Sequence, residues 1–79
     1  MPTPEDLRKI VVEALHASEL PRTLLAKDAK LGRATLESWV AGLRNPSAES
    51  VAQVATALEQ RGEHLQRLAA QLRTLLADG

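Results

Sequence analysis

The residues with the most distinctive binding chemistry lie near the middle of the 79-residue chain, between Arg33 and Glu37. The guanidinium of Arg33 can donate two hydrogen bonds to O6 and N7 of guanine, and the carboxylate of Glu37 can accept one from N4 of cytosine. The methyl groups of Ala34 and Thr35 can contact the methyl group of thymine. These side chains are therefore candidates for contacts with base edges in duplex DNA.

Positive charge is concentrated around these residues, although the formal net charge of the chain is zero. Residues 22–47 have a net charge of +3, whereas residues 1–21 and 48–79 have net charges of −2 and −1. A basic segment of this kind suits a polyanionic partner. The cations that could contact phosphates and orient the protein without reading sequence are Arg22, Lys27, Lys30 and Arg44.

Three of the central residues also have simpler interpretations. Arg33 and Glu37 are four residues apart, so on a helix they could form a solvated ion pair worth about 0.2–0.5 kcal/mol. Trp39 fits an apolar core better than a platform for stacking bases.

The elements that would position these residues are two short helices. Apolar residues form two helical stripes on either side of Lys30-Leu31-Gly32, a pattern typical of a helix-turn-helix. The second helix is expected over about 33–42, with Leu36 and Trp39 buried and Gly42 ending it. Pro21 suits the first turn of the helix before it.

Helices are also expected on both sides of this segment. Thr3 as N-cap and Pro4 at the first helical position predict a helix over 4–17. Its inward residues are expected to be Leu7, Ile10, Val11, Ala14 and Leu15. Ser47 is expected to cap a fourth helix whose apolar stripe is Val51, Val54, Ala55 and Leu58.

After Leu58 the sequence allows two interpretations. Gly62 could end the fourth helix, with a fifth running from about residue 63 to 77, or the helix could continue on a seven-residue apolar repeat. A glycine inside a helix costs only about 1 kcal/mol, which does not decide between them. We favour the break, and so expect one domain over 1–79 with a helical core over 1–61 and a leucine-rich C-terminal helix over 62–79.

The leucines of this last segment form either the chain's own core or a dimer interface. A chain this short has a marginal core, which sharing with a second copy would enlarge. We therefore favour an interface made by Leu65, Leu68, Leu72, Leu75 and Leu76.

A recognisable motif covers about residues 20–60. Its parts are Leu25-Ala26, the run from Leu31 to Trp39, Gly42-Leu43-Arg44-Asn45-Pro46-Ser47, and Ala57-Leu58. This motif resembles the phage repressor and Cro (XRE) family of helix-turn-helix proteins. The resemblance implies an all-α, lambda-repressor-like bundle of four to five helices with a central helix-turn-helix and a C-terminal helix for dimerisation, binding a pseudo-palindromic operator.

The resemblance also implies roles for individual residues. Lys30 stands where the family usually has glycine, and Gly32 where it usually has a serine-type cap, but lysine can adopt a positive φ and glycine can cap a helix. The expected base-reading residues are Arg33, Ala34, Glu37 and Ser38. The expected phosphate contacts are Arg22, Lys27, Lys30, Thr35, Arg44 and Asn45.

Other classes of protein find little support. The chain has no cysteine, and His16 and His64 are far apart, so no metal or cofactor is expected. It has no glycine-rich phosphate loop and no catalytic triad, so an enzyme is not expected. Because it has no signal sequence and no long apolar run, we expect a cytoplasmic protein without a membrane span.

The sequence therefore predicts a sequence-specific transcriptional regulator, most simply a homodimeric repressor that binds double-stranded DNA. An alternative is a helical interaction module, antitoxin-like or anti-activator, that binds another protein through Leu65–Leu76. RNA binding has weaker support, because the chain lacks the aromatic residues that stack single-stranded bases.

Overall fold

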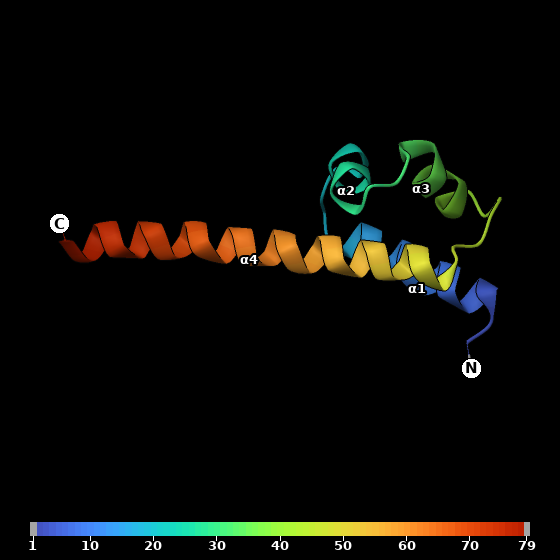
Figure 1. Ribbon diagram of the computed structural model, residues 1–79, viewed down its shortest axis with the longest axis horizontal. Helices are drawn as coiled ribbons and strands as arrows, with labels where there is room; N and C mark the ends of the chain where they lie inside the picture. Colours follow the sequence, from blue (N-terminus) through green and yellow to red (C-terminus); the bar gives the residue numbers. More distant parts are fainter. Residues whose placement is uncertain (1, 79) are drawn as a thin grey trace.

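The computed structural model describes residues 2–78 and, within them, consists of four α-helices without strands (Figure 1). Helices α1 (Pro4–Ala17), α2 (Arg22–Ala29) and α3 (Arg33–Val40) pack with the first half of α4 (Ala48–Asp78). We call this part, residues 2–61, the lobe. The rest of α4, residues 62–78, projects from the lobe as an arm, and the molecule measures 53 × 26 × 18 Å. The predicted all-α class is confirmed; Met1 and Gly79, the ends of the expected domain, lie outside the described residues.

Helix α1 has the predicted bounds and a complete capping box. The Oγ1 of Thr3 accepts from the N–H of Asp6, and the Asp6 carboxylate accepts from the N–H of Thr3, both at 3.1 Å. These hydrogen bonds to Thr3 hold the pKa of Asp6 below its ordinary value. The ionised carboxylate therefore favours folding at neutral pH, and this contribution is lost as the pH falls through the lowered pKa.

The joint between α2 and α3 contains the left-handed residue that the family resemblance implies. Lys30 has φ 59° and ψ 39° and ends α2, while Gly32 is extended and begins α3 as its N-cap. The N–H groups of Lys30 and Leu31 donate to the carbonyls of Lys27 and Ala26, which is the Schellman arrangement. The predicted conformation of Lys30 and the glycine cap are confirmed.

Helix α3 ends in the same way, two residues before the predicted boundary at 42. Gly42 has φ 76°, and the N–H of Leu43 donates to the carbonyl of Ser38 at 2.9 Å. The chain then crosses to α4 by a loop over residues 41–47, in which Pro46 is buried. Ser47 caps α4 as predicted, because its Oγ accepts from the N–H of Ser50 at 3.1 Å.

The core of the lobe lies between all four helices. Leu36 and Trp39 are 0% and 2% exposed, as predicted for the inner face of α3. The prediction that Ile10 points inward is wrong: it is 62% exposed, because Val11 and Leu15 carry the buried face of α1. The buried residues are Val11, Leu15, Leu25, Ala26, Ala29, Leu36, Trp39, Val54 and Ala57.

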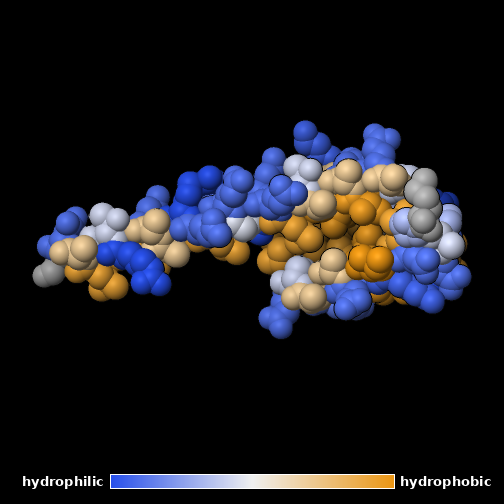
Figure 2. Space-filling model, turned by 90° about the horizontal axis from the view of Figure 1, so that it is seen from below, coloured by the Kyte–Doolittle hydropathy of each residue, from blue (hydrophilic) through white to orange (hydrophobic). Residues whose placement is uncertain are grey.

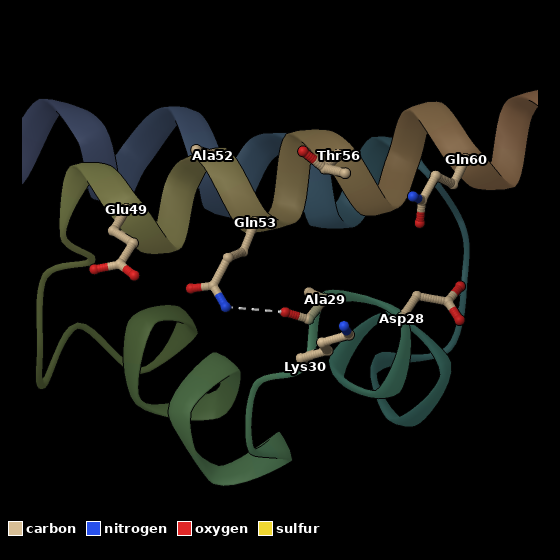
Figure 3. A pocket seen from close by; sticks show the side chains of 8 residues that line it. All are labelled: Asp28, Ala29, Lys30, Glu49, Ala52, Gln53, Thr56 and Gln60. Carbon is tan, nitrogen blue, oxygen red and sulfur yellow. Dashed lines mark hydrogen bonds between the residues drawn. The ribbon is translucent and has the colours of Figure 1, made fainter.

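Polar contacts fix α2 to α4. The Nε and Nη2 of Arg61 both donate to Oδ2 of Asp28, at 3.1 and 2.6 Å. Closer to the start of α4, the Nε2 of Gln53 donates to the carbonyl of Ala29 at 3.3 Å and so satisfies an acceptor at the end of α2 (Figure 3). The cleft between the two helices, about 340 Å³, is thus bridged by contacts that hold the fold together.

The expected break at Gly62 is wrong, because α4 is one helix from Ala48 to Asp78. Strong helix formers surround this glycine on both sides, and the neighbouring Arg61 is held by Asp28. The cost of a single glycine, about 1 kcal/mol, is smaller than that of ending one helix and starting another.

The left-handed conformation of Lys30 predicts that Lys30→Gly stabilises the protein. A non-glycine residue in this region costs about 1–2 kcal/mol, partly offset by the larger entropy of glycine in the unfolded chain. We expect the free energy of unfolding in urea to rise by about 0.5–1 kcal/mol. In the control, Lys27→Gly, the glycine lies inside α2 and should lower it by about 1 kcal/mol. A loss of stability in Lys30→Gly would contradict this account of the joint.

Candidate nucleic-acid interface

The outer face of α3 carries the residues predicted to read bases. Arg33 and Ala34 are exposed, whereas Glu37 and Ser38 are half-buried. The helix lies on the side of the lobe away from the arm (Figure 1). Because Leu36 and Trp39 are buried beneath it, the helix is anchored on one face and open on the other.

A shallow hollow of about 310 Å³ separates α3 from the loop that follows it. Ala34, Thr35 and Ser38 line it from the helix, and Leu43 and Arg44 line it from the loop. The side chain of Leu43 is 79% exposed, and the sequence prediction missed it. The one sequence signal for its exposure is its position directly after Gly42. The chain changes direction at this glycine, so Leu43 does not continue the buried face of α3.

Four cations on α2, α3 and the segments that follow these helices are available to a ligand. Lys27, Lys30, Arg33 and Arg44 are all exposed. The ion pairs of the described residues join Glu5 to Arg8 and Lys9, Arg22 to Glu37, and Arg61 to Asp28, so none involves these four. Their charges are therefore uncompensated by direct partners within residues 2–78.

Arg22, a predicted phosphate contact, is engaged inside the lobe. Its Nη1 donates to Oε1 of Glu37 at 3.4 Å, and its Nη2 lies 3.4 Å from Nδ1 of His16. The Nε is buried and has no hydrogen-bond partner. Arg22 thus joins α1, α2 and α3, and the simpler interpretation of Glu37 as the ion-pair partner of Arg33 is wrong.

Asn45, another predicted phosphate contact, also has a partner within the protein. Its Oδ1 accepts from the Nε of Arg8 at 3.1 Å. The guanidinium of Arg8 also lies beside Gly42, so Arg8 brings α1 next to two positions of the loop. The sequence prediction missed Arg8, because the contact joins residues 37 positions apart and leaves no local pattern.

The five leucines predicted to form an interface lie on the arm. They are between 42% and 79% exposed, so the alternative in which they form the chain's own core is wrong. Each lies beyond Arg61, where α4 has left the lobe. They are Leu65, Leu68, Leu72, Leu75 and Leu76.

Two other features are absent from the described part of the chain. Within residues 2–78, no three His, Cys, Asp or Glu side chains gather into a cluster that could hold a metal ion. Among the same residues, no helix has the length and apolar character needed to cross a membrane. Comparison of the chain with protein-family models, curated proteins and solved structures finds no match.

The bridge between Arg22 and Glu37 predicts a small, salt-dependent stabilisation. Glu37→Gln keeps the shape of the side chain and removes its charge, so the free energy of unfolding should fall by about 0.2–1 kcal/mol at low salt. The difference should shrink in 1 M NaCl, where charges are screened. Glu13→Gln on the exposed face of α1 is the control and should have no comparable effect. Equal effects of the two variants in urea titrations would show that the bridge contributes nothing.

Proposed function

We propose that this chain is a cytoplasmic, sequence-specific DNA-binding regulator of transcription that acts as a homodimeric repressor. In this proposal α2 and α3 are a helix-turn-helix, and α3 enters the major groove of a pseudo-palindromic operator. One observation carries the proposal: the exposed start of α3 is anchored by buried Leu36 and Trp39, and four exposed cations on α2, α3 and the segments after them form no ion pair within residues 2–78.

The proposed base contacts follow from the chemistry of each side chain on the open face of α3. Arg33 is exposed at the first position of the helix and can donate to guanine. The hydroxyl of Ser38 already donates to the carbonyl of Thr35 at 2.6 Å, so toward a base it would act as an acceptor. The bridge to Arg22 restrains Glu37, whose second oxygen is available to accept from cytosine. Ala34 would contact a thymine methyl group.

Among the proposed phosphate contacts, Lys27, Lys30 and Arg44 have the best support, because they are exposed and form no ion pair in the described part of the chain. Thr35 lines the same hollow as Arg44. Arg22 and Asn45 are engaged within the lobe, so we assign them mainly to positioning α3 and its loop.

A second candidate function is binding a different protein, and the exposed leucines of the arm favour it. If the chain were an antitoxin-like or anti-activator subunit, its partner protein would cover Leu65–Leu76. The face of α3 would then not need to contact DNA. Selection of bound duplexes from a random pool separates the two candidates. The proposed regulator should enrich two half-sites about 34 Å apart along the duplex, whereas an interaction module should enrich none, even at low salt.

Arg33→Ala should weaken binding to the selected duplex by about 5- to 150-fold per contact, corresponding to about 1–3 kcal/mol, and relax preference at one base position. Arg67→Ala is the matched control, because it also removes an exposed arginine but lies on the arm, far from α3 in the sequence. It should leave the affinity for the duplex unchanged. Fluorescence anisotropy with matched and substituted duplexes measures both effects. An unchanged preference in Arg33→Ala would argue against the assigned base contact.

Lys30→Gln should weaken binding to all duplexes alike, because a phosphate contact carries no sequence information. If a dimer neutralises about six to eight phosphates, the logarithm of the affinity should fall with the logarithm of salt concentration with a slope of about −5 to −7. The variant should make this slope less steep by about one for each phosphate that it no longer neutralises. Weaker binding to one sequence alone would contradict a phosphate role for Lys30.

A further inference from the structure

An open apolar groove lies between α1 and α4, on the far side of α4 from α2. Its volume is about 120 Å³, and its wall from α1 includes Ile10, which is 62% exposed. Figure 2 shows the groove as a hydrophobic patch on the lobe, with further apolar atoms along one edge of the arm. The residues that line it are Ile10, Val11, Ala14, Val51, Val54, Ala55 and Leu58.

The wall that α4 contributes continues along the arm as one stripe. Apolar or small residues recur at alternating spacings of four and three, which keeps them on one face of a helix. The stripe begins in the groove and ends at the last turn of the arm. Its members are Val51, Ala55, Leu58, Gly62, Leu65, Ala69, Leu72 and Leu76.

The side chains of this stripe are complementary in size to those of a second copy whose α4 runs in the opposite direction. Reversal about the midpoint between Glu63 and His64 places each small residue opposite a leucine. The opposed pairs are Val51 with Leu76, Ala55 with Leu72, Leu58 with Ala69, and Gly62 with Leu65. A parallel pairing instead places alanine on alanine and glycine on glycine, which leaves voids between the helices.

The charges beside the stripe favour the same direction. Glu59 and Arg73 each follow a leucine of the stripe, so they flank it on the same side. Antiparallel helices bring residues of that flank together. In this register Glu59 of one copy and Arg73 of the other are offset by five residues, about 7.5 Å along the axis, which two long side chains can span. In a parallel pair, Glu59 would face Val54 of the second copy and Arg73 would face Leu68 of the second copy. Neither of these partners carries a charge.

We propose that the groove is occupied by the arm of a second copy, so that two α4 helices pack antiparallel and each arm covers Ile10 of the other copy. This inference rests on the homodimer of the proposed function and gives it a direction and a register. It accounts for Gly62, where an added Cβ would meet open space in the single chain. In the dimer, Leu65 of the second copy fills that space.

The register sets the spacing of the two lobes. Val54 lies near the middle of α4 within the lobe, and residue 73 of the other copy stands opposite it. The two lobes are therefore separated by about 28 Å along the helix axis at about 1.5 Å per residue. This distance is comparable with one turn of B-DNA, about 34 Å.

Crosslinking of single introduced cysteines tests the antiparallel direction of the two α4 helices. The chain has no cysteine of its own to interfere. We expect Ala55→Cys and Leu72→Cys, mixed in equal amounts and treated with a short bis-maleimide, to form a covalent dimer of about half of the chains. Each variant alone should form none, because identical positions lie about 25 Å apart in the antiparallel pair. Both side chains are exposed in the single chain, so circular dichroism should show unchanged helix content.

Crosslinking of each variant with itself would indicate a parallel pair and overturn the proposal. Sedimentation equilibrium of the unmodified chain provides a second readout. A monomer at high micromolar concentration would also overturn it. This is the result expected if a different protein, and not a second copy, covers the stripe. Neither experiment contains DNA, so failure of the dimer and failure of duplex binding remain distinguishable.

Substitution of Gly62 tests the register. Gly62→Leu meets open space in the single chain but collides with Leu65 of the second copy, so dimer dissociation should increase at least tenfold while helix content is kept. Ala70→Leu is the matched control, since it adds the same leucine on an exposed face outside the stripe. A dissociation constant unchanged by Gly62→Leu, or changed equally by both variants, would overturn the register.

Discussion

The structure depends on the packing of two helices that are too short to be stable alone. Helices α2 and α3 have eight residues each, whereas isolated helices in water become marginal below about 12–15 residues. Burial of Leu25 in α2 and of Leu36 and Trp39 in α3 supplies the missing stability. The same burial determines which face of α3 is left open, so the candidate interface is a direct consequence of the core.

Helix α4 has two different environments along its length. In the lobe, Val54 and Ala57 are buried, and Arg61 and Gln53 hold α2 in place. Beyond Arg61 the side chains are exposed, although the apolar repeat continues. A contiguous exposed apolar surface on a small protein is typical of an interaction site. In the proposed antiparallel dimer a second copy of the chain covers this surface.

Local patterns predicted much of the fold. The caps at Thr3 and Ser47 and the burial of Trp39 depend on residues close in sequence or on helical spacing. The positive φ of Lys30 was expected from the family resemblance instead. Contacts between distant residues were not predictable in this way. The pairs Arg8 with Asn45 and Arg61 with Asp28 join residues 37 and 33 positions apart.

Two errors have physical causes of the same kind. The orientation of Ile10 depends on how α1 is rotated against α4, which its own periodicity does not specify. The continuity of α4 at Gly62 depends on the balance between a small propensity cost and the hydrogen bonds of an uninterrupted helix. For the candidate site, the sequence identified the exposed face of α3, but the engagement of Arg22 and the exposure of Leu43 required the packed structure.

The central claim is that the open face of α3 contacts duplex DNA. Mapping of backbone amide chemical shifts during titration with a selected duplex at low salt tests it most directly. The account predicts that the largest changes fall between Lys27 and Asn45 and that those of the arm stay small. Changes confined to the arm, or none at all with saturating duplex, would contradict it.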